Sequence, residues 1–196
     1  MLQIRIHGRG GQGVVTAAEL LSVAAFEQGR HAQAFPSFGS ERTGAPVVAF
    51  CRIDDREIRL REPILAPDVL IVQDPTLLHQ VDVFQGLRPD GYVLINSRRS
   101  FQDLGLAEIA QRFRPERLTT VPATEIAIKH LGRPLTFAVL LGGFAALSGL
   151  ITLDAVALAI RAKFGGKVAD GNVAAATEAF SFVKREMEEL AHAEAG

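Results

Sequence analysis

The stretch that decides the fold lies near the start of the chain and reads Leu2-Gln3-Ile4-Arg5-Ile6-His7-Gly8-Arg9-Gly10-Gly11-Gln12-Gly13. Residues 2–6 alternate apolar and polar side chains, which is typical of a β-strand. Residues 8–13 match the pattern G-x-G-x-x-G, and residues 14–28 repeat apolar side chains at helical spacing. A strand, a glycine turn and a helix in this order predict an α/β fold whose turn offers backbone N–H groups at the helix amino end.

Strand and helix patterns continue to alternate beyond this opening. Residues 31–35, 46–53, 57–60, 69–72, 92–95 and 118–121 are predicted strands, and residues 76–80, 123–130, 136–148, 153–164 and 170–191 are predicted helices. Segments 46–53 and 57–60 flank Asp54-Asp55 and predict a β-hairpin. We expect a mainly parallel, doubly wound α/β sheet with this hairpin and a helical C-terminal third. We expect one domain over residues 1–196, with residues 136–192 mostly helical.

The composition of the chain excludes several classes of protein. The net charge is −1, so nothing suggests nucleic-acid binding, and Cys51 is the only cysteine, which excludes a disulfide framework or an Fe–S cluster held by this chain alone. Residues 135–153 carry no charge, but Gly149 is a predicted helix end and Thr152 a predicted N-cap. The first of the two resulting helices is too short to span a membrane, which favours a buried core helix. We expect a cytoplasmic protein with no membrane contact.

The glycine turn is the first candidate site and comprises Gly8, Arg9, Gly10, Gly11, Gln12 and Gly13. No acidic residue ends the second predicted strand, which argues against a nicotinamide dinucleotide, and no Gly-Lys-Ser/Thr follows, which excludes a Walker-type site. Three interpretations remain open: binding of a phosphate or carboxylate, contact with a partner subunit, or glycines that only permit close packing of the helix.

The loop after the second predicted strand is the second candidate site, with Ser40, Glu41, Arg42, Thr43 and Gly44. In a doubly wound sheet this loop lies beside the glycine turn, and an arginine there can pair with a phosphate or carboxylate through two hydrogen bonds. The alternative is a solvated surface loop. No metal-ligand spacing among the histidines, no nucleophile elbow and no carboxylate pair accompanies these loops, so the chain is predicted to be part of a larger enzyme.

Three motifs in order support that prediction: GRGGQGVVTAAELL at residues 8–21, AFPSFGSERTGAPV at residues 34–47 and DPTLL at residues 74–78. Together they resemble the gamma subunit of pyruvate and related 2-oxoacid:ferredoxin oxidoreductases, and the likeness extends to about residue 184. The resemblance implies a non-catalytic subunit of a complex that decarboxylates a 2-oxoacid such as pyruvate to an acyl-CoA.

The resemblance also implies what surrounds the chain. Its partners would be thiamine-binding alpha and beta subunits and a ferredoxin-like subunit. The complex would use thiamine diphosphate, magnesium, Fe–S clusters and coenzyme A, and this chain would hold none of these cofactors. Both candidate loops would face the active-site region and shape the approach of coenzyme A. The alternatives are a stand-alone nucleotide-binding oxidoreductase and a pure scaffold subunit.

Overall fold

The computed structural model describes residues 1–37 and 42–195 and contains a six-stranded sheet of order β2-β3-β1-β4-β5-β6. The strands are β1 (Leu2–Arg9), β2 (His31–Pro36), β3 (Pro46–Asp54), β4 (Val69–Val72), β5 (Tyr92–Asn96) and β6 (Leu118–Val121). β1, β4, β5 and β6 pair in parallel, whereas β3 is antiparallel to both β1 and β2. The mainly parallel sheet with one hairpin is therefore confirmed, and β2 runs in the same direction as β1.

The prediction that residues 46–53 pair with residues 57–60 is wrong. β3 pairs with β2, with His31 opposite Asp54 and Pro36 opposite Ala49, while residues 57–60 form no strand. The pairing with β2 places Phe35 against Phe50, with ring centroids 5.1 Å apart. Residues 57–60 alternate charged side chains and remain largely exposed, so they offer β3 no comparable apolar contact.

The predicted helices are present near their expected positions, and the structure adds two short ones at residues 107–110 and 115–117 that were not predicted. They are α1 (Val14–Glu27), η1 (Pro75–His79), α2 (Ala107–Ala110), η2 (Pro115–Arg117), α3 (Ala123–Leu131), α4 (Phe137–Ser148), α5 (Leu153–Lys163) and α6 (Gly166–Ala195). The uncharged run is divided as expected, because Gly149 ends α4 with φ 65° and the Thr152 side chain caps α5 by accepting a hydrogen bond from the N–H of Ala155. None of the helices in the described ranges is both long and apolar enough to cross a membrane.

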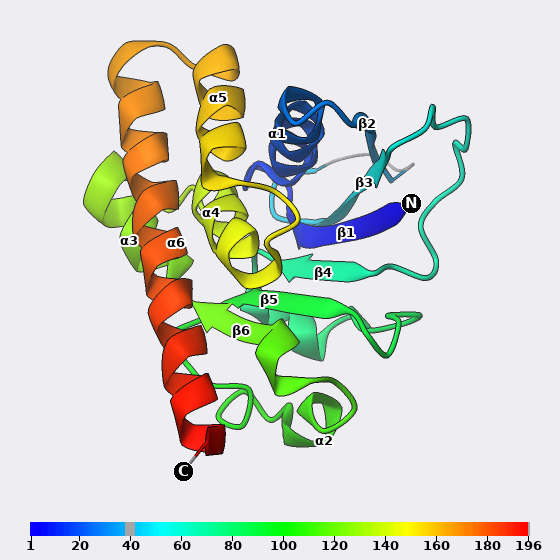
Figure 1. The fold of residues 1–196 in the computed structure, drawn as a ribbon, viewed down its shortest axis with the longest axis vertical. Helices are drawn as coiled ribbons and strands as arrows, with labels where there is room; N and C mark the ends of the chain where they lie inside the picture. The colour runs from blue at the N-terminus through cyan, green and yellow to red at the C-terminus, as the bar shows by residue number, and fades with distance from the viewer. Residues whose placement is uncertain (38–41, 196) are drawn as a thin grey trace.

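The long helices cover one face of the sheet. α1 packs against β1, β2 and β3, and α4 lies between the sheet and the outer helices α5 and α6 (Figure 1). α4 is accordingly buried on every side, which explains its uniformly apolar sequence.

The other face is covered by short helices and irregular segments, and two arginines fix these segments to the sheet. Arg5 of β1 is buried and donates hydrogen bonds to the carbonyl oxygens of Val83 (2.8 Å) and Gln85 (2.6 Å). Arg52 of β3 donates to the carbonyl oxygen of Glu62 at 2.6 Å. These charge-assisted bonds supply the anchoring that packed helices provide on the first face.

Candidate functional site

The structure brings the glycine turn and the following loop together at the carboxyl ends of β1 and β2. The N–H of Gly10 donates to the carbonyl oxygen of Ala45 at 2.9 Å, and the N–H of Gly44 donates to the carbonyl oxygen of Gly10 at 3.1 Å. Thr43 also forms an isolated bridge with Gly10. Of the predicted loop residues, Ser40 and Glu41 lie outside the described residues, whereas residues 42–44 lie against the turn as expected.

Three of the four glycines in the turn are required by close contacts. A Cβ at Gly8 would lie 2.5 Å from Cγ2 of Val14, and a Cβ at Gly13 would lie 2.7 Å from Cδ1 of Phe137. A Cβ at Gly10 would lie 2.1 Å from the carbonyl oxygen of Arg42. Gly11 differs, because its φ of 90° demands glycine while the space beside it is open. Helix packing therefore accounts for Gly8 and Gly13, the close approach of the loop accounts for Gly10, and neither accounts for Gly11.

The close contact between Gly10 and the loop argues against binding of a dinucleotide at the turn. In dinucleotide-binding folds the second glycine of the turn lets the pyrophosphate approach the backbone. Here the chain's own carbonyl at Arg42 lies at that glycine. This arrangement agrees with the sequence argument against a dinucleotide.

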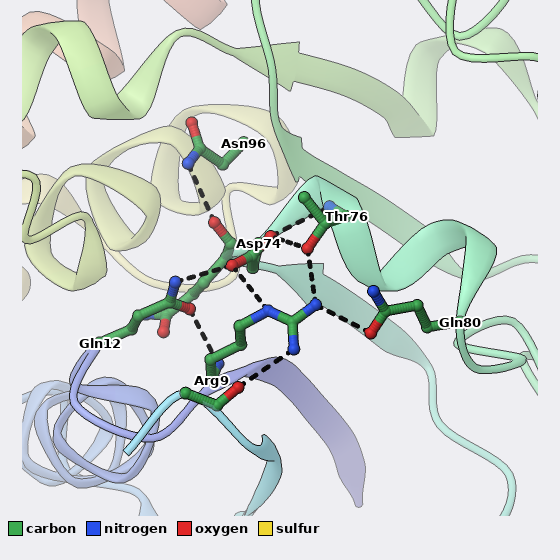
Figure 2. A network of polar contacts seen from close by, with 8 residues as sticks. Arg9, Gln12, Asp74, Thr76, Gln80 and Asn96 are labelled. Atoms are coloured by element: carbon green, nitrogen blue, oxygen red, sulfur yellow. Dashed lines mark hydrogen bonds and ion pairs between the residues drawn. The ribbon is translucent and has the colours of Figure 1, made fainter.

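The side chain of Arg9 makes hydrogen bonds within the chain and does not extend into solvent as a free cation. Its Nη2 donates to Oγ1 of Thr76 and Oε1 of Gln80, both at 2.8 Å, and its Nη1 donates to the carbonyl oxygen of Gly44 at 3.1 Å. Its Nε lies 3.2 Å from Oδ2 of Asp74 (Figure 2). Arg9 thus joins the glycine turn to the loop and to η1, which gives it a positioning role.

Asp74 is the centre of this network and is only 13% exposed. Its Oδ2 accepts a hydrogen bond from Nε2 of Gln12 at 2.8 Å, and its Oδ1 accepts from the N–H and Oγ1 of Thr76. Burial disfavours the charged carboxylate, but hydrogen bonds from Thr76 and Gln12 and the charge of Arg9 outweigh it, so the pKa of Asp74 lies below its ordinary value. Asp74 is therefore ionised at neutral pH.

A second polar cluster continues along the same edge of the sheet. Asn96, at the end of β5, donates from Nδ2 to the carbonyl oxygen of Gln73 and to Oγ1 of Thr124, both at 2.9 Å, and accepts from the N–H of Thr124. Asp74, Gln73 and Asn96 were not among the site residues predicted from the sequence. The sequence pattern could have indicated them, because polar residues that directly follow buried parallel strands meet at one edge of a sheet.

Arg42, Thr43 and Gly44 are exposed, so this part of the loop presents its side chains outward. We call the surface formed by Gly11 and residues 42–44 the carboxyl-edge surface. Its backbone is fixed from beneath by Arg9 and Gly10. A guanidinium held on such a fixed loop is suited to bind an anionic group.

The side chains of His7 and Cys51 are buried in the interior. Burial, followed by the charge of Arg5, lowers the pKa of His7 to about 4, and burial raises the pKa of the Cys51 thiol to about 12. Both side chains are therefore neutral at pH 7. Within residues 1–37 and 42–195, no group of three or more His, Cys, Asp or Glu is placed to hold a metal ion.

Gly10→Ala tests how the loop is held. The new methyl group would overlap the carbonyl oxygen of Arg42, so residues 42–45 must move and lose their two backbone hydrogen bonds to Gly10. At about 1 kcal/mol for each bond, we expect hydrogen exchange at Gly44 to become roughly 10- to 30-fold faster. Gly165→Ala is the control, because its Cβ meets open space. Unchanged exchange at Gly44 in Gly10→Ala would contradict this view of the loop.

Comparison with known proteins identifies relatives over nearly the whole chain. The family model described as pyruvate ferredoxin/flavodoxin oxidoreductase matches residues 3–182. The common subunit gamma of the pyruvate/ketoisovalerate oxidoreductases of Pyrococcus abyssi is 47% identical over 180 residues, covering 92% of this chain and 96% of that protein. The pyruvate synthase subunit PorC of Methanothermobacter marburgensis is 46% identical over 184 residues, covering 94% and 98%.

Solved structures agree in fold. The crystal structure of the pyruvate oxidoreductase subunit PORC of Thermotoga maritima superposes with a TM-score of 0.76 at 33% identity, covering 92% of this chain and 95% of that chain. The resemblance to gamma subunits that the three sequence motifs indicated is therefore confirmed.

Proposed function

The chain belongs to the pyruvate ferredoxin/flavodoxin oxidoreductase family, and from this premise we propose that it is the non-catalytic gamma subunit of a 2-oxoacid:acceptor oxidoreductase complex. The observation that carries the proposal is the match in length as well as sequence. The relatives named as gamma subunits or PorC align over at least 96% of their own residues. The match thus extends over nearly the full length of those relatives.

The proposed partners are thiamine-binding alpha and beta subunits and a ferredoxin-like subunit. Thiamine diphosphate, magnesium and Fe–S clusters supply the decarboxylation and electron-transfer chemistry of such a complex and are proposed to reside in those partners. The residues of this chain do not fit an Fe–S cluster, because cluster iron is bound by several thiolates. Cys51 is the single cysteine, and it is fully buried with a raised pKa.

The carboxyl-edge surface is proposed to face the active-site region of the complex and to shape the approach of coenzyme A. The phosphates of coenzyme A are anions that match the exposed guanidinium of Arg42 and the uncapped amino end of α1, where Gly13 supplies no side-chain hydrogen bond. Arg9, Gln12 and Asp74 act beneath this surface by holding the loop and the glycine turn in register.

Arg42→Ala tests this proposal in the assembled complex. Hydrogen bonds between charged groups contribute about 1.5–3 kcal/mol, so we expect the KM for coenzyme A to rise roughly 10- to 100-fold with kcat little changed. Arg59→Ala is the matched control, because Arg59 is 85% exposed and pairs with Glu57 in the segment after β3, which leaves the sheet at the opposite edge. Its KM should equal that of the wild type.

Two other outcomes distinguish the alternatives. Normal assembly with an unchanged KM in Arg42→Ala would indicate a pure scaffold subunit. Tight binding of NAD by the purified chain would indicate a stand-alone nucleotide-binding oxidoreductase, which the close approach of Arg42 to Gly10 argues against.

A further inference from the structure

An open cleft of about 510 Å³ lies at the amino ends of the parallel strands, at the opposite edge of the sheet from the carboxyl-edge surface. Residues that begin or directly precede β1, β4, β5 and β6 line it, namely Leu2, Asp68, Tyr92 and Arg117. These four strands run in one direction, so their amino ends gather on one side of the molecule (Figure 1). The cleft is therefore separate from the glycine turn and from the loop at residues 42–44.

Three guanidinium groups from separate segments of the chain line this cleft. Arg30 directly precedes β2, Arg88 lies in the turn before β5, and Arg117 ends η2. The planar fork of N–H groups on an arginine matches the geometry of phosphate and carboxylate oxygens. Three such groups at one cleft favour an anionic ligand.

Arg117 is held in a fixed direction by partners that carry no negative charge. Its Cζ lies 4.7 Å from the centroid of the Tyr92 ring, and its Nη1 donates a hydrogen bond to the carbonyl oxygen of Asp90. Within residues 1–37 and 42–195 it forms no ion pair, since the carboxylates of the cleft pair with other arginines. A fixed cation without a counter-charge is suited to bind an anion from solution, because little side-chain freedom is lost on binding.

Arg30 and Arg88 use only Nε for contacts within the described part of the chain. Nε of Arg30 donates to Oδ1 of Asp55 at 3.0 Å, and Nε of Arg88 lies 3.4 Å from Oδ1 of Asp68. The terminal nitrogens of both side chains have no hydrogen-bond partner among the described residues. Since a guanidinium has five N–H groups, these two arginines retain several donors for a bound anion.

The main chain beneath Arg88 is fixed by hydrogen bonds between two segments. The N–H of Arg88 donates to the carbonyl oxygen of Pro67 at 3.1 Å, and the N–H of Gly91 donates to the carbonyl oxygen of Arg88 at 2.8 Å. The N–H of Tyr92 donates to the carbonyl oxygen of Asp68 at 2.9 Å. The backbone positions that carry the arginine and the aromatic ring are therefore set before a ligand binds, which lowers the entropic cost of binding.

Two carboxylates at the cleft narrow the class of anion. Asp68 pairs with Arg88 and accepts a hydrogen bond from the N–H of Gln3 at 2.8 Å. Asp90 pairs with Arg114, with Nε and Oδ1 3.4 Å apart. A singly charged anion gains little where part of the positive charge is already compensated. A diphosphate carries several charged oxygens and can contact more than one guanidinium, so it gains more.

We propose that this cleft binds a diphosphate group, with Arg117 as its fixed contact and the terminal nitrogens of Arg30 and Arg88 as further donors. The diphosphate is either free or carried by a nucleotide, because the cleft offers its donors to phosphate oxygens alone. The inference assigns the chain a second anion site, at the amino ends of its strands, and does not depend on the proposed function.

The test uses the full-length chain labelled with ¹⁵N and three probes at matched ionic strength: inorganic pyrophosphate, uridine diphosphate and sulfate. Pyrophosphate is expected to shift the Nε–Hε resonance of Arg117 with a Kd below about 1 mM, and sulfate is expected to bind at least about 10-fold more weakly. Uridine diphosphate identifies the source, since equal or tighter binding than pyrophosphate indicates a nucleotide and weaker binding indicates a free diphosphate. Absence of pyrophosphate binding would overturn the inference, and so would equal binding of sulfate, which indicates an adventitious ion only.

Two substitutions with opposite expected effects test the assigned residues. Arg117→Ala removes the fixed guanidinium, and we expect the affinity for pyrophosphate to fall at least about 10-fold. Asp90→Asn removes a negative charge from an exposed position at the cleft and is expected to raise the affinity roughly 2- to 5-fold.

Arg161→Ala is the matched control for these variants. Arg161 is 51% exposed on α5 and pairs with Asp170, away from the residues of the cleft. Its affinity for pyrophosphate should equal that of the wild type. Unchanged affinity in Arg117→Ala, or a lower affinity in Asp90→Asn, would overturn the inference.

Discussion

Gly142→Ala is expected to lower the free energy of unfolding of the chain by about 3 kcal/mol, which corresponds to a fall in Tm of roughly 6–12 °C for a chain of this size. Gly142 lies on α4 where α6 crosses it, and a Cβ there would lie 2.0 Å from the backbone carbonyl oxygen of Ala176. A backbone atom inside a helix cannot rotate away, so the two helices must separate. This separation would open the core between α4 and α6, the most extensive helix contact in the fold.

Gly143 provides an internal control one residue further along the same helix. A Cβ there would meet its nearest neighbour, Val121, at 3.4 Å, which is an ordinary contact. Alanine is favoured over glycine in a helix by about 1 kcal/mol, so Gly143→Ala is expected to leave the Tm unchanged or raise it slightly. Thermal unfolding followed by circular dichroism compares the two variants. Equal Tm values would mean that the helices do not approach as closely as the structure indicates.

Asp74→Ala is expected to lower the activity of the assembled complex strongly. It removes the counter-charge of Arg9 and the acceptor of Gln12, at a cost of about 2–3 kcal/mol to the local network. Arg9 and Gln12 then lose the carboxylate that fixes their side chains, so the glycine turn and the loop at Gly44 are no longer anchored to the start of η1. We expect coenzyme A-dependent turnover of the assembled complex to fall roughly 10- to 100-fold, measured as kcat/KM for coenzyme A.

Asp55→Asn is the matched control, because Asp55 is 84% exposed and its only recorded ion pair among the described residues is with Arg30. Its kcat/KM should match the wild type.

The stability of Asp74→Ala measured as a function of pH gives an independent readout. The folded-state pKa of Asp74 is lowered, so its stabilising contribution is complete above the unfolded-state pKa and is lost as the pH falls through the folded-state value. Asp74→Ala should therefore reduce the loss of stability in acid, and an acid profile identical to the wild type would exclude Asp74 as the centre of the network.

Local sequence signals predicted most of the fold. The apolar runs at β4 and β5 and the glycine and threonine that divide α4 from α5 each act over a few residues, so pattern alone placed them correctly. The hairpin was wrong because two adjacent segments were assumed to pair. β3 instead pairs with β2, whose apolar side chains fit it better.

The candidate site was predictable in place but not in detail. Strand direction alone indicated that the glycine turn and the loop would be neighbours, and residues 42–45 lie there. The partners of Arg9 were not predictable, because Thr76 and Gln80 lie 67 and 71 residues further along the chain. A motif shows which residues are close in sequence, whereas the orientation of a guanidinium depends on acceptors that only the fold brings near.

The central claim is that this chain acts as one subunit of a larger oxidoreductase. Native mass spectrometry tests it most directly, on the 21.1 kDa chain purified alone and on the chain co-expressed with the proposed thiamine-binding and ferredoxin-like subunits. The account predicts stoichiometric assemblies that contain the chain and show 2-oxoacid- and coenzyme A-dependent activity, which the chain alone lacks. A chain that stays free of those subunits and reduces an acceptor by itself would contradict it.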